Sequence, residues 1–277
     1  MLYTLPMTHS SPPKIGLALG SGGARGLAHI GVIQALLESH IPIDIITGSS
    51  SGALIGGMYT SLGSIEKVKE ITTSVTYKDL ANVLMDIGSL SGVIRGKKLE
   101  EFLHAILDDQ TIESLPLSFA TVGTDLSTGL PVTFRSGDLV QAIRASSSIP
   151  AVFDAYVYND MYIVDGGESL PVPVRTAKEL GATFTIAVNL DVFDLPQIPT
   201  NGHKPNLKDM GVAALTLLRT NLSRELCREA DITITPDVAS TSSLNLVQFI
   251  NGDEIIQKGY EAAIQEIPMI KEKLSLK

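Results

Sequence analysis

Residues 41–63 read IPIDIITGSSSGALIGGMYTSLG, which places a serine-rich turn between an apolar run and a helix-like segment of small residues. The run 41–48 is rich in isoleucine, as expected of a buried strand. The spacing Gly48-x-Ser50-x-Gly52 then fits a nucleophile elbow, in which a serine sits on a sharp turn from a strand into a helix. The stretch therefore predicts one strand–helix unit of an α/β fold with a candidate nucleophile at its turn.

Ser50 is the serine that fits the elbow, because Ser49 and Ser51 lack glycine two residues before and two residues after them. The flanking Gly48 and Gly52 suit a tight turn, where larger side chains would collide with the neighbouring strand or helix. The helix N-terminus that follows adds partial positive charge beside the hydroxyl. A simple helix N-cap is the alternative interpretation, since serine is favoured at that position too.

The rest of the chain extends this pattern. Residues 14–20 form a short apolar run that ends in glycine, and 24–40 carry apolar residues at helical spacing. Two successive strand–helix units begin a parallel layer of an α/β fold. We therefore expect a loose tail over 1–13 and a single domain over 14–277, built on a mainly parallel central sheet. Further expected elements are hairpins over 117–134 and 155–167, strands over 182–190 and 231–237, and helices over 207–230 and 251–267.

Composition narrows the class of protein. The net charge of −9 and the pI of about 5.0 argue against nucleic acid, whose phosphates would be repelled, and give no attraction to anionic lipid. The single Cys227 cannot form an internal disulfide, and no apolar run approaches the ~20 residues that span a bilayer. With no signal-peptide pattern at the N-terminus, we expect a cytoplasmic protein. No cluster has metal-ligand spacing, so neither a metal nor a cofactor is expected.

A second motif, GSGGARG over residues 20–26, follows the first predicted strand. A dinucleotide fingerprint would need glycine at position 25, and a P-loop would need Gly-Lys-Ser/Thr. The third interpretation is an oxyanion loop that turns bare backbone N–H groups toward an anion. It fits best, because this loop and the elbow end successive strands and so share one edge of a parallel sheet. The candidate oxyanion residues are Gly22, Gly23, Ala24, Arg25 and Gly26.

The proton acceptor is less evident. An α/β-hydrolase orders its triad as serine, acid and histidine, and only His203 lies well downstream of the elbow. It stands in a polar, proline-rich loop, where a solvated histidine is the simpler interpretation. Asp165 is the better candidate, because it follows the strand-like MYIV and precedes two glycines that expose it. An ordinary strand-end turn explains the same residues.

Together these motifs resemble the patatin-like phospholipases, in particular their short bacterial single-domain members. The resemblance runs from Ile15 to about Leu190 and rests on GLALGSGGARGLAHIGV, GSSSG, ASSSIPAVF and DGG, in the family's order and spacing. It implies a three-layer α/β/α sandwich, a Ser50 nucleophile, an Asp165 base without histidine, and an oxyanion hole formed by the glycine loop. It also implies a lipid or acyl-ester substrate, transient contact with a membrane surface, and no cofactor.

The glycine loop and the elbow also differ from the family's pattern. Plant patatins have Asp-Gly where this chain has Gly20-Ser21, and the family often has Thr and a small apolar residue at positions 49 and 51. These changes leave the proposed dyad intact but bear on the preferred acyl chain and head group. The expected oxyanion donors are the backbone N–H groups of Gly22, Gly23 and Ser51.

Other features have more than one interpretation. Arg25 holds the loop, meets an anionic head group or is a surface charge. The apolar stretch 79–94 is core packing or a flap over the site. Five further acids are expected to serve local turns or strand ends: Asp44, Asp125, Asp154, Asp160 and Asp191.

The sequence therefore predicts a serine acyl hydrolase that acts on ester bonds of lipids. A small-molecule carboxylesterase or thioesterase is the alternative among enzymes. A regulatory protein that keeps the fold with little catalysis is the alternative outside them.

Overall fold

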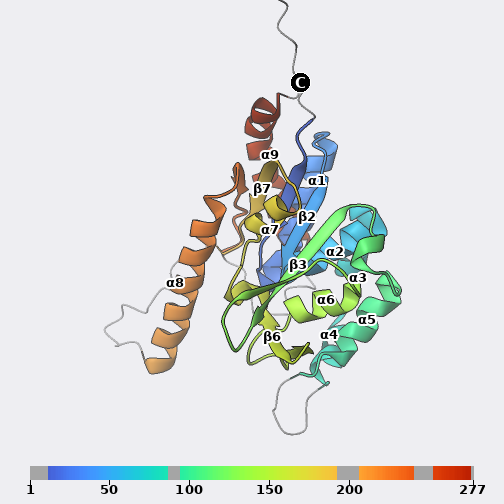
Figure 1. Cartoon of the computed structure of the whole chain (residues 1–277), viewed down its shortest axis with the longest axis vertical. Coiled ribbons are helices and arrows are strands. Elements are labelled where there is room, and N and C mark those ends of the chain that lie inside the picture. The colour runs from blue at the N-terminus through green and yellow to red at the C-terminus, as the bar shows by residue number, and fades with distance from the viewer. Residues whose placement is uncertain (1–11, 87–93, 192–205, 240–251, 276–277) are drawn as a thin grey trace, which may run out of the picture.

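The computed structural model describes residues 12–86, 94–191, 206–239 and 252–275 and is built around one eight-stranded sheet (Figure 1). The strand order is β5-β6-β3-β2-β1-β7-β8, with β4 paired to β3. The strands are β1 (Ile15–Leu19), β2 (Ile45–Ser49), β3 (Ser118–Asp125), β4 (Pro131–Phe134), β5 (Tyr156–Tyr158), β6 (Met161–Asp165), β7 (Phe184–Val188) and β8 (Ile232–Ile234).

The centre of the sheet is parallel and one side of it is antiparallel. β1, β2, β3, β7 and β8 run in the same direction, and Leu17 of β1 pairs with Ile46 of β2 and Ile186 of β7. β4 and β6 run antiparallel to β3, and Asp165 at the end of β6 lies opposite Gly123 of β3. The prediction of a mainly parallel central sheet is confirmed, and both predicted hairpins are present.

Helices cover both faces of the sheet, which gives the predicted three-layer α/β/α sandwich. Leu17 and Leu19 of β1 join a large core with the helices of one face, whereas Ala18 packs with Val174 and Cys227 on the other. The first face carries α1 (Ala28–Glu38), α2 (Ser51–Leu62), α3 (Ile65–Ser74), α5 (Lys97–Leu107), α6 (Leu139–Ser146) and α9 (Gly252–Leu274). The second carries α7 (Val174–Glu179) and the C-terminal part of α8 (Leu207–Cys227); the remaining helices are α4 (Tyr77–Leu84), η1 (Gly23–Leu27), η2 (Ile112–Ser114) and η3 (Gly166–Glu168).

Several element boundaries differ from those predicted, and two of the differences have a clear physical cause. The segment 24–40 begins as the 3₁₀ turn η1 and becomes α-helical only at Ala28, because the glycine loop opens it. The closing helix does not end at residue 267, because α9 continues through Pro268. Ile270, two residues further on, is fully buried, and this packing outweighs the hydrogen bond that proline removes.

Asp44 also differs from its predicted local role. Its carboxylate accepts a hydrogen bond from the backbone N–H of Ile15 at 2.7 Å and so ties the approach to β2 to the start of β1. Most of the predicted tail over 1–13 lies outside the described residues, as do His203 and residues 87–93 of the predicted flap. Among the helices described, none is both long and apolar enough to cross a membrane.

Candidate active site

The sheet brings the predicted nucleophile and base together along one edge of β3, whose other edge is taken by β4. Ser50 follows β2, which pairs with residues 118–122 of β3, and Asp165 ends β6, which pairs with residues 123–125 further along the same edge. The Oγ atom of Ser50 donates a hydrogen bond to Oδ2 of Asp165 at 2.5 Å. The two residues are only 4% and 2% exposed, so this hydrogen bond is shielded from water.

The turn at Ser50 has the strained geometry of an elbow. Ser50 has a φ of 54° and a ψ of −118°, a left-handed conformation that costs a non-glycine residue energy. Ser50 occupies the N-cap position of α2, but its side chain makes no capping hydrogen bond there. A Cβ atom on Gly48 would lie 2.5 Å from the backbone of Ala53, and one on Gly52 would lie 2.2 Å from the carbonyl oxygen of Leu19. Both glycines are therefore required by close backbone contacts.

Burial makes Asp165 a stronger base than an exposed aspartate. Desolvation raises its pKa from 3.8 to about 6, although the positive charge of Arg219 and hydrogen bonds from Ser50 and the Gly167 N–H oppose the shift. The Gly167 N–H bonds Oδ1 at 2.8 Å, which leaves Oδ2 for Ser50. At neutral pH the carboxylate is mainly ionised and can accept a proton.

The serines of the ASSSIP segment fix the positions of both residues. The Oγ atom of Ser146 accepts the N–H of Ser50 at 2.9 Å and donates to the carbonyl of Val122 at 2.6 Å. The carbonyl of Ser148 accepts the N–H of Asp165 at 2.9 Å. Sequence reasoning used this segment only as a mark of resemblance and assigned its serines no role. The run of three serines after a helix was the available signal.

Buried Arg144 in turn supports Ser148. Its Nη1 donates to the Oγ of Ser148 at 2.6 Å, and its Nη2 donates to the carbonyl of Arg95 at 2.8 Å. The guanidinium also lies over the ring of Phe153, 5.1 Å from the ring centroid. The helix α6 thus holds the segment that positions both members of the Ser50–Asp165 pair.

The glycine loop packs directly against the elbow. A Cβ atom on Gly26 would lie 2.3 Å from the Cβ of Ser51, so the loop can approach this closely only with glycine there. Gly23 has a φ of 57° and lines the same cavity as Ser50 and Ser51. Among the described residues, nothing accepts a hydrogen bond from the N–H groups of Gly22, Gly23 or Ser51. Gly22 faces Leu190, since a Cβ there would lie 2.8 Å from that side chain.

Arg25 lies inside the protein, so the interpretation as a surface charge is wrong. Its side chain is fully buried, bonds the carbonyl of Gly22 at 3.3 Å through Nε and pairs with Asp191 at 3.4 Å. Desolvation lowers the pKa of Arg25 to about 10, partly offset by the charge of Asp191, so the guanidinium stays charged at neutral pH. Its buried position excludes contact with a lipid head group in this conformation and supports the interpretation that it holds the loop.

Asp191 has far more than the local role predicted for it. It is 1% exposed and follows β7 at the same edge of the sheet as the elbow. Besides pairing with Arg25, it accepts hydrogen bonds from Arg219 Nε at 3.1 Å and Ser223 Oγ at 2.8 Å. Sequence reasoning missed this acid, although its position after a buried parallel strand was the same signal that located Ser50.

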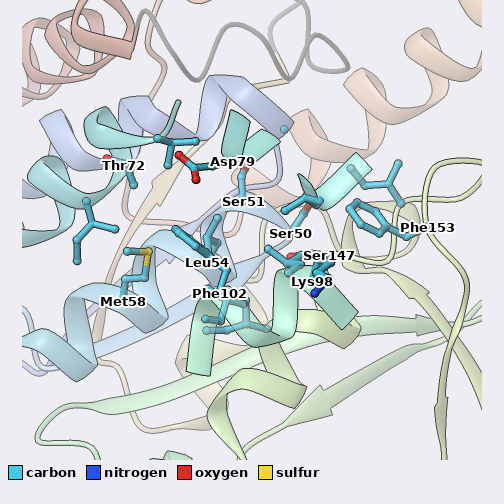
Figure 2. Close-up of a pocket in the computed structure, with 18 of the residues that line it drawn as sticks. Ser50, Ser51, Leu54, Met58, Thr72, Asp79, Lys98, Phe102, Ser147 and Phe153 are labelled. Carbon is cyan, nitrogen blue, oxygen red and sulfur yellow. The ribbon is translucent and has the colours of Figure 1, made fainter. Parts of the chain in front are cut away.

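Ser50 opens onto a mainly apolar cavity of about 200 Å³ (Figure 2). Leu54 and Met58 follow Ser50 along α2 at helical spacing and line the cavity away from the serine. Its other walls come from α3, α4, α5, α6 and the segment through Phe153. The residues of α4 that line it belong to the predicted flap over 79–94: Asp79, Asn82 and Val83.

No histidine of the described chain is placed to accept the serine proton. His29 is fully buried on α1 and donates from Nε2 to the carbonyl of Gly20 at 2.7 Å. Burial lowers its pKa to about 4, so it is neutral and supports the glycine loop. His104 lies on α5 beside Asp109. Asp125 keeps its predicted role, since it ends β3 and accepts the Thr128 hydroxyl in the following turn.

Comparison with known proteins gives matches over most of this chain. A family model described as patatin-like phospholipase matches residues 17–178. An uncharacterized NTE family protein of Mycobacterium tuberculosis is 40% identical over 198 residues, which cover 72% of this chain and 54% of the relative. Human patatin-like phospholipase domain-containing protein 6 is 30% identical over 196 residues, which cover 68% of this chain and 14% of that protein. The match therefore spans about half of the mycobacterial relative and a small part of the human one.

The fold is also found in a solved structure. The crystal structure of VipD from Legionella pneumophila aligns with a TM-score of 0.53 and 16% identity, covering 94% of this chain and 67% of that one. At this identity the likeness concerns the fold alone, and it agrees with the three-layer arrangement described above.

Proposed function

The chain belongs to the patatin-like phospholipase family, and on this basis we propose that it is a serine acyl hydrolase that cleaves ester bonds of lipids. The observation that carries the proposal is the 2.5 Å hydrogen bond between Ser50 and Asp165, buried at the mouth of an apolar cavity. Ser50 is the nucleophile and Asp165 the base. The family membership supplies the reaction class, and the pair of side chains supplies the chemistry.

In the first half of the reaction, Ser50 Oγ attacks the ester carbonyl while its proton passes to Asp165 Oδ2. The negative charge that develops on the carbonyl oxygen is stabilised by backbone N–H groups of the glycine loop and of Ser51, each donor being worth roughly 3 kcal/mol. Collapse of this intermediate breaks the ester bond, and the leaving alcohol takes the proton from Asp165. The acyl group then remains on Ser50.

In the second half, water replaces the alcohol. Asp165 accepts a proton from the water as it attacks the acyl-enzyme, and the same N–H groups stabilise the second oxyanion. Ser50 recovers its proton when the fatty acid leaves. No histidine is needed, because desolvation has already raised the pKa of Asp165 to about 6.

The cavity favours a lipid over a small polar ester. Leu54, Met58 and Phe102 line it, and such a lining gains free energy by burying an acyl chain. A small-molecule carboxylesterase or thioesterase would use the same pair but gain little from this space. A regulatory protein without catalysis would have no use for a strained serine bonded to a buried carboxylate.

The test is a phospholipid assay and a short-chain ester assay on one preparation, together with labelling by a fluorophosphonate. We expect hydrolysis of both substrates and labelling in the wild type, and loss of all three in folded Ser50→Ala. Ser49→Ala is the matched control and should still be labelled. Labelling that disappears in Ser49→Ala but persists in Ser50→Ala would disprove the assignment of the nucleophile.

A further inference from the structure

A buried polar network joins the glycine loop to the second helical layer. At its centre is Asp191, which contacts Arg25 of the loop and both Arg219 and Ser223 of α8. Asp191, Arg219 and Ser223 lie outside residues 17–178, the segment that the family model matches. The network therefore connects a helix from the C-terminal part of this chain to the glycine loop of the candidate site.

Arg219 is the member of this network that reaches both halves of the site. Its Nη2 donates to Ser21 Oγ at 2.6 Å, and Ser21 is one of the two loop positions that differ from plant patatins. A Cβ atom on Gly167 would lie 2.9 Å from Arg219 Nη2 and equally 2.9 Å from Asp165 Oδ1. The guanidinium and the carboxylate thus flank the same bare glycine.

We propose that Arg219 is a positioning residue that ties the glycine loop to α8 through Ser21 and Asp191 and places a fixed positive charge beside Asp165. This inference rests on the proposed function. The two effects of Arg219 can be tested separately. The hydrogen bonds to Ser21 and Asp191 need the geometry of a guanidinium, whereas the charge beside Asp165 needs only a cation.

The tie matters because oxyanion donors act only when they point at the developing charge. Within the glycine loop, Arg25 bonds the carbonyl of Gly22. The loop then joins the rest of the network through Ser21, which contacts Asp191 and Arg219, and through Arg25, which contacts Asp191. Displacement of a reacting group by about 1 Å can cost on the order of a hundredfold in rate. Loss of the Ser21 contact should therefore lower kcat more than it raises KM.

The charge matters because it determines when Asp165 is ionised. Two charged groups act on Asp165: Arg219, whose positive charge lowers its pKa, and Glu168 of η3, whose negative charge raises it. Arg219 itself faces Asp191, Asp165 and Glu168. Without the guanidinium, only the hydrogen bonds from Ser50 and the Gly167 N–H oppose Glu168 and desolvation, and the pKa of Asp165 rises. The acidic limb of kcat/KM, below which the base is protonated, then moves to higher pH.

The experiment compares three variants with one control. Arg219→Met removes both the tie and the charge, and Arg219→Lys keeps the charge without the two-point hydrogen bonding. Ser21→Ala keeps Arg219 and removes the hydroxyl that accepts from Arg219 and donates to Asp191. Arg224→Met is the control, because Arg224 lies on the same helix, is exposed and bonds only Asn221 within it. For each, kcat and KM for a soluble short-chain ester are measured against pH, with thermal melts to confirm folding.

We expect Arg219→Met to lose on the order of 10- to 100-fold in kcat and to shift its acidic limb upward. Arg219→Lys and Ser21→Ala should lose kcat while their acidic limb stays at the wild-type pH, and Arg224→Met should match the wild type throughout. A folded Arg219→Met with the wild-type kcat and acidic limb would overturn the proposal. If that variant does not fold, a wild-type kcat in Ser21→Ala overturns it instead.

This outcome is distinct from failure of the proposed function. If Ser50→Ala hydrolyses the ester as fast as the wild type, the function itself is wrong, whatever the Arg219 variants do. If Ser50→Ala is inactive and the Arg219 variants behave as the wild type does, only the positioning role is wrong.

Discussion

At the scale of single residues, the proposed site depends on one buried carboxylate. Asp165 receives hydrogen bonds from Ser50 and the Gly167 N–H and is closed off from water. An aspartate in water has a pKa of ~3.9 and would accept a serine proton poorly. Here the cost of burying the charge raises the pKa to about 6, which is what the proposed role as a lone base requires.

The first prediction concerns this base. Asp165→Asn should lower kcat by on the order of a thousandfold, because the amide keeps the shape but cannot accept the serine proton. In the wild type, kcat/KM should fall as the pH drops below about 6, where Asp165 becomes protonated. The measurement is a pH–rate profile for both proteins, with thermal melts to confirm folding.

His203→Ala is the control for that prediction. His203 is the residue that a histidine-dependent hydrolase would need in the usual chain order, and we expect its loss to be nearly neutral. An active Asp165→Asn beside an inactive, folded His203→Ala would replace the dyad with a histidine mechanism.

At the scale of elements, two glycines have similar backbones and different surroundings. Gly23 in the glycine loop has a φ of 57°, and Gly63 after α2 has a φ of 65° with nothing within 4 Å of an added Cβ. Alanine at either position has to adopt the left-handed conformation, which costs roughly 1 to 2 kcal/mol. Only at Gly23 does the backbone lie beside the nucleophile.

The second prediction uses this pair. Gly23→Ala should lower kcat by on the order of a hundredfold with a smaller effect on KM, because the loop relaxes and misdirects its N–H groups. Gly63→Ala should destabilise the fold by a similar amount and leave kcat unchanged. Steady-state kinetics and melts on both variants provide the comparison, and equal kcat values would remove the loop from the mechanism.

The third prediction concerns the length of the cavity. Ser50, Leu54 and Met58 follow one another along α2, so Met58 lies about 12 Å from the serine at 1.5 Å per residue. Met58→Trp should fill the far end and reduce kcat/KM for long-chain esters by tenfold or more, within the range of pocket discrimination. A two-carbon acyl ester should be hydrolysed at the wild-type rate.

A series of esters of increasing chain length measures this effect. The expected result is a cutoff that moves to shorter chains in Met58→Trp. An equal loss for all chain lengths would mean that the acyl group does not lie along α2.

The sequence was enough to predict the motifs of the candidate site, but not the contacts between distant residues that hold these motifs in place. The elbow, the glycine loop and Asp165 could be predicted because each carries a local signal, a glycine spacing or a strand end. Ser146 and Arg219 could not be placed, since an ordinary serine or a helical arginine acquires its partner only when distant segments pack. The predicted end of the closing helix at residue 267 was wrong for the same reason, because α9 continues through Pro268 to bury Ile270.

At the scale of the whole molecule, the buried base lowers the stability of the fold. Asp165 has a pKa of about 6 in the folded chain and one near 3.8 when unfolded, so between these values the native state holds the proton more tightly. The contribution of Asp165 to the free energy of unfolding is therefore most favourable below pH 4 and is lost as the pH rises to about 6. A difference of this size corresponds to ~3 kcal/mol.

The fourth prediction follows from that sign. Relative to the wild type, Asp165→Asn should gain ~3 kcal/mol in the free energy of unfolding between pH 4 and pH 7, because the amide never carries the buried charge. Denaturant titrations at the two pH values measure the gain. Asp160→Asn, in the exposed β5–β6 turn, is the matched control. A stability difference independent of pH would show that Asp165 is not desolvated as described.

The antiparallel pairing of β6 with β3 has one more consequence. Because Asp165 reaches Ser50 only when it lies opposite Gly123, a slip of β6 by one residue would turn its carboxylate to the other face of the sheet. A chain refolding from denaturant could therefore regain helices and strands and still leave its serine inert. Reactivity toward a fluorophosphonate, followed during refolding, would then report when β6 reaches its native register against β3.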